Sequence, residues 1–185
     1  GSGTVSVNAD GVSVDYTPAA DFNGTEVITY TVSDGELSDA TGILTITVTA
    51  VNDAPVAIAD TATVLEDSAL TNIDVISNDT DVEGDTLTLI TATPDGSGTV
   101  SVNADGVSVD YTPTANFNGT ETITYIVSDG IDTSTGALTI TVTAVNDAPV
   151  AIADTASVEE DAAITNINVI SNDTDVEGDT LTLIT

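Results

Sequence analysis

Long stretches of this sequence occur twice, and this repetition constrains the fold more than any other feature. The stretch GSGTVSVNADGVSVDYTP occupies residues 1–18 and again 96–113. The stretch VNDAPVAIADTA occupies 51–62 and 145–156, and SNDTDVEGDTLTLIT occupies 77–91 and 171–185. The repeat is thus roughly 95 residues long, the length of one small domain. We therefore expect tandem copies of a single domain type.

The pattern within each repeat predicts β-strands. Short runs rich in Val, Ile and Thr alternate apolar with polar residues, and Gly, Asp, Asn or Pro separate the runs. Asp105-Gly106 and Asp129-Gly130 are typical of hairpin turns. In the central repeat we expect seven strands, A to G, near residues 56–64, 69–75, 86–91, 99–103, 107–112, 121–127 and 136–143. The expected fold class is all-β, with tandem seven-strand Ig-like Greek-key sandwiches.

The repeat boundaries divide the chain unevenly. Residues 1–51 correspond to strands D–G of one repeat, 52–144 to a complete repeat, and 145–185 to strands A–C of a further one. Half a sandwich cannot cover its inner face or pair its sheet edges. Two interpretations stay open: a window of a longer array, or completion of residues 1–51 by residues 145–185 of a neighbouring copy. The second would give a head-to-tail polymer of identical repeats.

All charged side chains in this sequence are acidic. The chain has 31 Asp and Glu residues and no Lys, Arg or His, so its formal charge is −31. Because no internal salt bridge between side chains can form, only protons, dissolved salt or bound cations can neutralise the carboxylates. Crowded carboxylate oxygens favour a hard divalent ion, and we expect Ca²⁺ as the cofactor. Halophilic solubility is an alternative explanation, but it predicts evenly spread charge, whereas these carboxylates cluster.

Composition also excludes several functions. Without Cys or His the chain has no thiolate or His-based nucleophile and no ordinary zinc site. Without Lys or Arg it repels nucleic acid and anionic membranes, and no apolar run approaches the roughly 18 residues of a membrane span. Paired carboxylates remain as a catalytic option, but those present lie in loops and linkers, so we expect no enzyme. The aromatic residues are expected in domain cores: Tyr16, Phe22, Tyr30, Tyr111, Phe117 and Tyr125.

The most specific motif is DTDVEGD at residues 79–85, which recurs at 173–179. Oxygen ligands at alternate positions, followed by Gly at the sixth, match the first half of an EF-hand calcium loop. The twelfth position is Ile90 rather than Glu, so a remote oxygen would have to complete the site. The alternative is a solvated acidic loop without an ion. The candidate ligands here are Asp79, Asp81, Glu83, Asp85, Asp173, Asp175, Glu177 and Asp179.

A second acidic motif, NDAP, links the repeats at residues 52–55 and 146–149. Its Pro stiffens the linker, and a rigid hinge without an ion is the structural alternative. In an Ig-like sandwich the B–C and F–G loops share the pole of the N-terminus, and the A–B turn lies at the other. We therefore expect two acidic junctions. The first would combine Asn52, Asp53, the loop 79–85 and Asp129; the second would combine Glu66, Asp67, Asn146, Asp147 and the loop 173–179.

The motifs NDAPVA, EDSAL, EDAAI, NDTDVEGDTLT and FNGTETITYIVSDG resemble the bacterial Ig-like or cadherin-like tandem repeats of very large surface adhesins. The resemblance covers the whole chain. The NDAP segments are similar to the interdomain calcium linker of cadherins, which implies ligand roles for Asn52, Asp53, Asn146 and Asp147. Glu66 and Glu160 match the A–B glutamate of that pattern. The family implies a repetitive stalk or fibre.

These observations together predict an extracellular structural repeat of an adhesin stalk or surface filament, made rigid by calcium at the interdomain junctions. The expected location is a bacterial or archaeal cell surface. The alternative is a calcium-dependent carbohydrate- or surface-binding module, which would need an exposed ion with a nearby aromatic residue.

Overall fold

The protein is all-β in its computed structural model, which describes residues 3–36 and 39–184. Nothing in those ranges forms a helix long and apolar enough to cross a membrane. The strands are β1 (Thr4–Val7), β2 (Val14–Thr17), β3 (Gly24–Val32), β4 (Ala40–Val48), β5 (Asp60–Leu65), β6 (Thr71–Asp74), β7 (Thr88–Pro94), β8 (Thr99–Val102), β9 (Ser108–Thr112), β10 (Gly119–Ser128) and β11 (Thr133–Thr143).

The central repeat forms a seven-strand sandwich. One sheet has the order β5-β11-β10-β7 and the other β6-β9-β8. Strand β5 runs parallel to β11, and every other pairing is antiparallel. All seven strands predicted in this repeat are present, with ends shifted by a few residues. The all-β Ig-like fold is confirmed.

The hydrophobic core lies within this sandwich. Tyr125, Val127 and Leu138 are fully buried, and Phe117 packs against the core from its edge. Glu121 is also buried, but its charge is well satisfied. Its Oε2 accepts a 2.6 Å hydrogen bond from the Tyr111 hydroxyl, and its Oε1 accepts from the N–H groups of Ser97 and Gly98. A buried carboxylate with this many donors is a stable part of a core.

Residues 3–51 contain two separate hairpins. β1 pairs with β2 and β3 pairs with β4, and no further strand joins either pair among the described residues. Tyr30 is 46% exposed, whereas its counterpart Tyr125 in the central repeat is 0% exposed. The expectation that Tyr30 fills a core is therefore wrong for this structure, because no second sheet covers β3.

Residues 145–184 contain no strand in the structure, apart from an isolated bridge between Val150 and Thr174. Closely similar sequences form β5, β6 and the first part of β7 in the central repeat, where they pair with β11, β9 and β10. The strands A–C expected here therefore do not form. The reason is physical: these strands pair only with strands of the other half-domain, and isolated strands are not stable in water.

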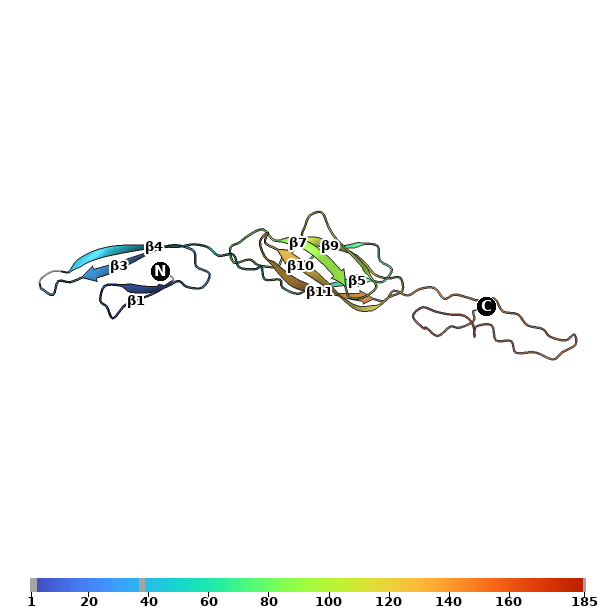
Figure 1. Ribbon diagram of the computed structural model, residues 1–185. Coiled ribbons are helices and arrows are strands. Elements are labelled where there is room, and N and C mark those ends of the chain that lie inside the picture. The colour runs from blue at the N-terminus through green and yellow to red at the C-terminus, as the bar shows by residue number, and fades with distance from the viewer. Residues whose placement is uncertain (1–2, 37–38, 185) are drawn as a thin grey trace.

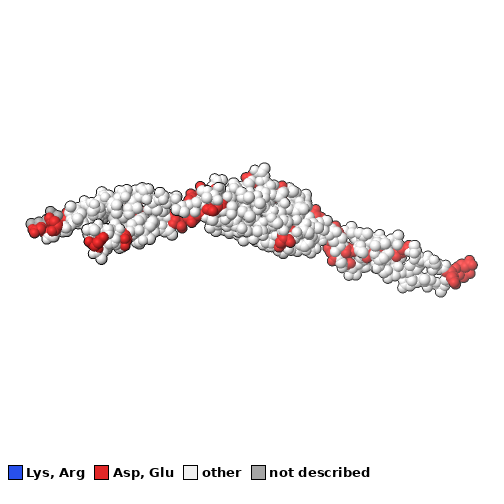
Figure 2. Space-filling view, in the orientation of Figure 1, with Lys and Arg blue, Asp and Glu red and all other residues white. Residues whose placement is uncertain are grey.

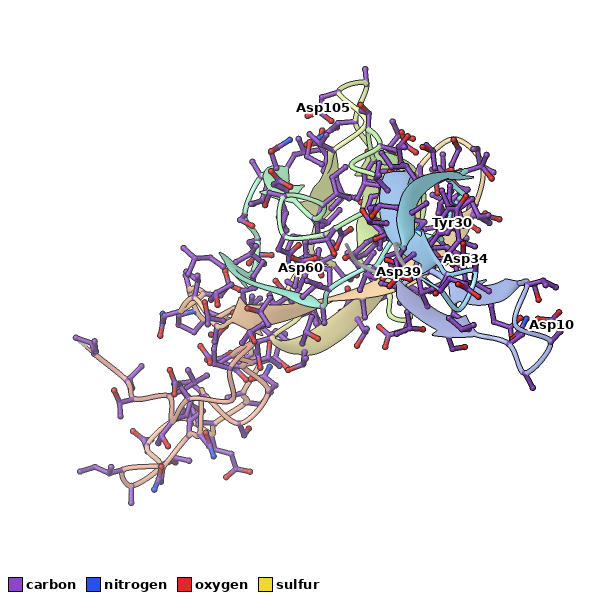
Figure 3. The ribbon with its side chains drawn as sticks, turned by 90° about the vertical axis from the view of Figure 1, so that its left-hand side faces the viewer. Asp10, Tyr30, Asp34, Asp39, Asp60 and Asp105 are labelled. Atoms are coloured by element: carbon purple, nitrogen blue, oxygen red, sulfur yellow. The ribbon has the colours of Figure 1, made fainter. Side chains whose placement is uncertain are left out.

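The three parts follow one another in a row (Figure 1), with the sandwich in the middle and the partial repeats at either end. Asp10 and Asp105 occupy the same turn in successive repeats. Seen along the row, Asp105 lies at the top and Asp10 at the right (Figure 3). Successive repeats are therefore rotated relative to one another about the long axis.

Candidate metal centres at the domain junctions

The acidic loop after β6 is built from local contacts. Val56 and Thr80 exchange backbone hydrogen bonds of 2.8 and 3.2 Å. Asp79 Oδ1 accepts from the Ile58 N–H at 2.7 Å, and Asp81 Oδ1 accepts from the Asp85 N–H at 2.9 Å. Gly84 has φ of +78°, a conformation that suits glycine and allows the loop to turn back.

The copy of this loop has the same geometry, although the strands around it are not formed. Val150 and Thr174 form the equivalent bridge. Asp173 Oδ1 accepts from the Ile152 N–H at 2.8 Å, and Asp175 Oδ1 accepts from the Asp179 N–H at 2.9 Å. The acidic loop is thus a local unit that does not depend on the rest of the sandwich.

Each acidic loop is joined to the linker that precedes it. Glu83 Oε2 accepts from the Asp53 N–H at 3.2 Å, and Glu177 Oε2 accepts from the Asp147 N–H at 3.1 Å. The preceding asparagine in each linker donates its side-chain amide to the carbonyl of that aspartate. The fifth residue of the DTDVEGD motif therefore positions the aspartate of the NDAP motif.

At the first junction four of the expected residues lie together: Asn52, Asp53, Glu83 and Asp129. The Asn52 side-chain amide donates to Asp129 Oδ2 and to Asp132 Oδ2, both at 2.9 Å, so the linker is held against the β10–β11 turn. A hollow at the linker is lined by Asp53, Glu83 and Asp21, among others. Asp21 lies in the turn between β2 and β3 of the preceding repeat. Three carboxylates from three segments therefore surround this hollow.

At the second junction a glutamate from the central repeat joins the linker. Glu66, in the turn after β5, is 2% exposed. Its Oε1 accepts from the Val145 N–H at 2.7 Å, whereas its Oε2 is buried without a hydrogen-bond partner. This arrangement differs from Glu121, for which both oxygens have donors. A buried, unpaired carboxylate oxygen is costly unless a cation or proton compensates it.

Buried carboxylate oxygens without a donor also occur in the linker and the next repeat at this junction. Asp147 Oδ2 and Glu177 Oε1 are also buried without a hydrogen-bond partner. Burial raises the pKa of the Asp147 carboxyl, and the charges of the neighbouring acidic residues raise it further; in order of effect they are Asp67, Glu177, Glu66 and Asp175. Carboxylates this close together repel one another in the ionised state. The second junction therefore presents acidic oxygens and no positive group.

Not all motif residues face a junction. Asp79 Oδ2 and Asp81 Oδ2 are buried without a hydrogen-bond partner. The pKa of Asp79 is raised by burial and by the charge of Asp60, whose side chain accepts from the Tyr125 hydroxyl. Asp79 therefore lies beside the central sandwich, and Asp85 contributes its backbone N–H to the loop. In the copy, Asp173, Asp175, Asp179 and Asn146 line one hollow beside the linker.

The carboxylates approach one another without forming a complete ligand shell. Within residues 3–36 and 39–184, no group of three or more Asp or Glu side chains is arranged as a ready-made metal cluster. Any cation at a junction would therefore have to draw on backbone carbonyl, asparagine or water oxygens as well, which are ordinary calcium ligands.

Sequence reasoning missed three contributors to these sites. Asp21 lines the first hollow, Asp132 accepts from Asn52, and Asp60 lies next to Asp79. Asp21 gives a weak sequence signal: it is the third residue after Tyr16-Thr17-Pro18, where the central repeat has Asn116. Both residues have positive φ, 58° and 59°, which Asn and Asp tolerate better than most residues.

Figure 2 shows the charge on one face of the molecule. On the face shown, acidic side chains gather at both junctions and at the two tips, while the sandwich between the junctions is largely uncharged apart from small patches. The acidic side chains on this face are therefore clustered rather than evenly spread.

Tandem Ig-like repeats joined by short acidic linkers define a class of repetitive all-β proteins. The chain belongs to the bacterial Ig domain family, whose model matches residues 1–47, 52–143 and 146–185. A search of curated proteins found no match.

Solved structures similar to this chain include endo-fucoidan hydrolases of glycoside hydrolase family 107. MfFcnA4 is 21% identical, with a TM-score of 0.39, and the match covers 77% of this chain and 22% of that one. MfFcnA9 is 20% identical, with a TM-score of 0.35, over 76% of this chain and 26% of that one. This chain thus spans about a quarter of the length of those proteins.

Proposed function

We propose that this chain is a structural repeat of an extracellular stalk or surface filament, and that Ca²⁺ bound at the interdomain junctions makes it rigid. The single observation that carries the proposal concerns unpaired carboxylate oxygens at the second junction. There, Glu66 Oε2, Asp147 Oδ2 and Glu177 Oε1 are all buried without hydrogen-bond partners. Membership of the bacterial Ig domain family supports a repetitive, load-bearing role.

The donor set fits calcium better than other cations. All available ligands are oxygens from carboxylates, amides and the backbone, and Ca²⁺ accepts six to eight such ligands in irregular geometry. Mg²⁺ demands near-ideal octahedral geometry, which two short linkers and a turn are poorly placed to supply. Zn²⁺ and Cu²⁺ prefer nitrogen or sulfur ligands, and this chain has no His or Cys.

The proposed role of the ion is to connect segments that otherwise repel. Glu66 belongs to the central sandwich, Asp147 to the linker and Glu177 to the next repeat. Without a cation, like charge favours separation of the two repeats. A shared cation replaces that repulsion with attraction to all three segments, which restricts bending at the linker.

The free energy expected from calcium binding is large enough to change the stability of the protein. With a dissociation constant of order 10⁻⁴ M, as in extracellular calcium modules, and about 10 mM Ca²⁺, mass action stabilises the folded junction by about 2.7 kcal/mol per site. Domains of this size are stable by only about 5–15 kcal/mol, so one or two ions change both stability and stiffness substantially.

Thermal unfolding of the 185-residue chain tests the proposal. We expect the melting temperature to rise in 10 mM CaCl₂ relative to a chelator, and to rise much less in 10 mM MgCl₂. NaCl at equal ionic strength controls for general charge screening. Equal melting temperatures in Ca²⁺, Mg²⁺ and matched NaCl would show that screening alone explains the acidity.

A further inference from the structure

The first and last strands of the central sandwich lie side by side and run in the same direction. β5 pairs with β11 from Asp60 opposite Leu138 to Leu65 opposite Thr143. Every other pairing in this sandwich is antiparallel. β5 is the first strand after one NDAP linker, and β11 is the last strand before the next. These two strands therefore connect the sandwich to its neighbours along the row of repeats (Figure 1).

A pull along the row reaches this strand pair from opposite ends. The force enters β5 at its N-terminal end and leaves β11 at its C-terminal end. Because the strands are parallel, these two ends lie at opposite ends of the shared ladder, so the force slides the strands past each other. Parallel ladders have evenly spaced hydrogen bonds, which are then all loaded together. A pull on both strands from the same end separates one residue pair after another instead.

We propose that the β5–β11 ladder is a mechanical clamp that keeps the central sandwich folded when the repeats are stretched. The clamp goes beyond the proposed calcium junctions and is independent of them, because its bonds are backbone hydrogen bonds that need no cation. Resistance to forced unfolding is governed by the unfolding rate rather than by equilibrium stability alone. The clamp therefore predicts a resistance that depends on the direction of the pull.

The side chains on the inner face of the ladder keep water away from its hydrogen bonds. Val64 of β5 is 5% exposed, and it lies opposite Val142 of β11, which is 2% exposed. Leu138 and Ile140 of β11 are fully buried in the same core. A hydrogen bond is stronger where water is excluded, and water cannot replace its partners one at a time. The burial of this face therefore favours rupture of the ladder as a unit.

Three further hydrogen bonds reinforce the ladder where β11 leaves the sandwich. The Glu66 N–H donates to the Thr143 carbonyl at 2.9 Å, and the Thr143 hydroxyl donates to the Val64 carbonyl at 3.1 Å. The Val145 N–H donates to the Glu66 carboxylate at 2.7 Å. A force that leaves β11 passes through Thr143 and Val145 before it reaches the next repeat. The extra bonds therefore lie at the end of the ladder where that force is applied.

Single-molecule force measurements on the whole 185-residue chain, in chelator, compare two directions of pull. Handles at the two chain ends load β5 and β11 from opposite ends. Handles at the N-terminal end and at Ile131→Cys load both strands from the same end, because Ile131 lies in the turn before β11 and is 72% exposed. The chain has no other Cys, so the second handle attaches at one position.

The direction of pull should decide the unfolding force of the central sandwich. We expect a force several times higher in the end-to-end geometry than with the handle at Ile131→Cys. The event is recognised by the length it releases, on the order of 30 nm for one repeat at about 3.5 Å per residue. Equal forces in the two geometries would overturn the proposal. Because calcium is absent throughout, that result would leave the proposed calcium junctions untouched.

Two matched substitutions separate the clamp from general stability. Val142→Ala removes two methyl groups at the ladder, and Val109→Ala removes the same atoms from β9 in the other sheet. Val142 is 2% exposed and Val109 is 0% exposed, so both variants should lower the melting temperature to a similar extent. In the end-to-end geometry we expect Val142→Ala to lower the unfolding force clearly more than Val109→Ala does. Equal reductions, or a larger one for Val109→Ala, would contradict the clamp.

Discussion

The backbone N–H of Val145 donates a 2.7 Å hydrogen bond to Oε1 of Glu66, which ties the linker after β11 to the turn after β5. The second oxygen of the same carboxylate is buried and has no donor. One side chain therefore both positions the linker and leaves a buried acidic oxygen without a donor at the second junction. This relationship is the basis of the proposed calcium junction.

Replacing Glu66 with Gln separates these two roles. The Gln side-chain carbonyl can still accept from Val145, but the charge that would bind a cation is lost. We expect Glu66→Gln to melt at or above the temperature of the parent in chelator, because one repelling charge is removed, and to lose the part of the calcium-dependent rise that the second junction supplies, on the order of 10 °C for a site worth about 2.7 kcal/mol. Differential scanning calorimetry with and without Ca²⁺ measures both values. Glu36→Gln, which removes one exposed charge away from the second junction, is the matched control and should behave like the parent.

The Asp105 turn predicts an acid-dependent loss of stability that is independent of calcium. The Asp105 carboxylate accepts from the N–H groups of Val107 and Ser108 and from the Ser108 hydroxyl. The backbone hydrogen bond from Val107, followed by the Ser108 hydroxyl, lowers its pKa below the ordinary 3.8. A lowered pKa stabilises the fold above pH 3.8, and this contribution disappears as the pH falls through the lower, folded-state value.

Two measurements check this turn. NMR titration should give pKa values below 3.8 for both Asp105 and Asp10, because Asp10 makes the same hydrogen bonds in its own hairpin. The difference in stability between the parent and Asp105→Ala should be largest above pH 4 and shrink towards zero at lower pH. A difference that stays constant down to pH 2 would contradict the assignment.

Close packing of a glycine against a tyrosine ring distinguishes the complete sandwich from the half-sandwich. A Cβ at Gly136 would lie 2.1 Å from the ring of the fully buried Tyr125. We expect Gly136→Ala to destabilise the sandwich by about 1–3 kcal/mol, the usual effect of overpacking. At Gly42 the equivalent atom would lie 2.3 Å from the Tyr30 ring, which is 46% exposed and has room to move. Urea unfolding of single copies should therefore show a much smaller effect for Gly42→Ala.

Much of the fold follows from sequence pattern alone. The seven strands of the central repeat are predictable because alternation of Val, Ile and Thr, bounded by Asp-Gly turns, has a direct structural cause. Tyr30 was expected in a core and is 46% exposed, and residues 145–184 carry the strand pattern but form no strand in the absence of the other half of their sandwich. Closely similar sequences adopt different structures in these places, because strand formation depends on partners that the local pattern does not encode.

The candidate site was predictable in its larger features and not in its detail. The grouping of Glu66 and Asp67 with Asp147 required only knowledge of which turns and loops lie at each end of an Ig-like sandwich. By contrast, the neighbour that each carboxylate of residues 79–85 contacts depends on the direction of its side chain. Glu83 reaches the linker, whereas Asp79 turns back towards Asp60 and Tyr125. An EF-hand-like spacing could not reveal this difference, since the loop here lies between strands rather than helices.

The central claim is that calcium restricts motion between the sandwich and the next acidic loop. The chain has no Cys, so spin labels at Ser101→Cys and Ser171→Cys are the only labelled sites, and dilution with unlabelled chain removes distances between copies. Electron–electron double resonance then gives the distance distribution across the second junction. The account predicts a broad distribution in chelator and in Mg²⁺ and a narrow one in Ca²⁺, while a Ser101→Cys and Thr133→Cys pair within the sandwich stays unchanged. A distribution of equal width in chelator and in saturating Ca²⁺ would contradict it.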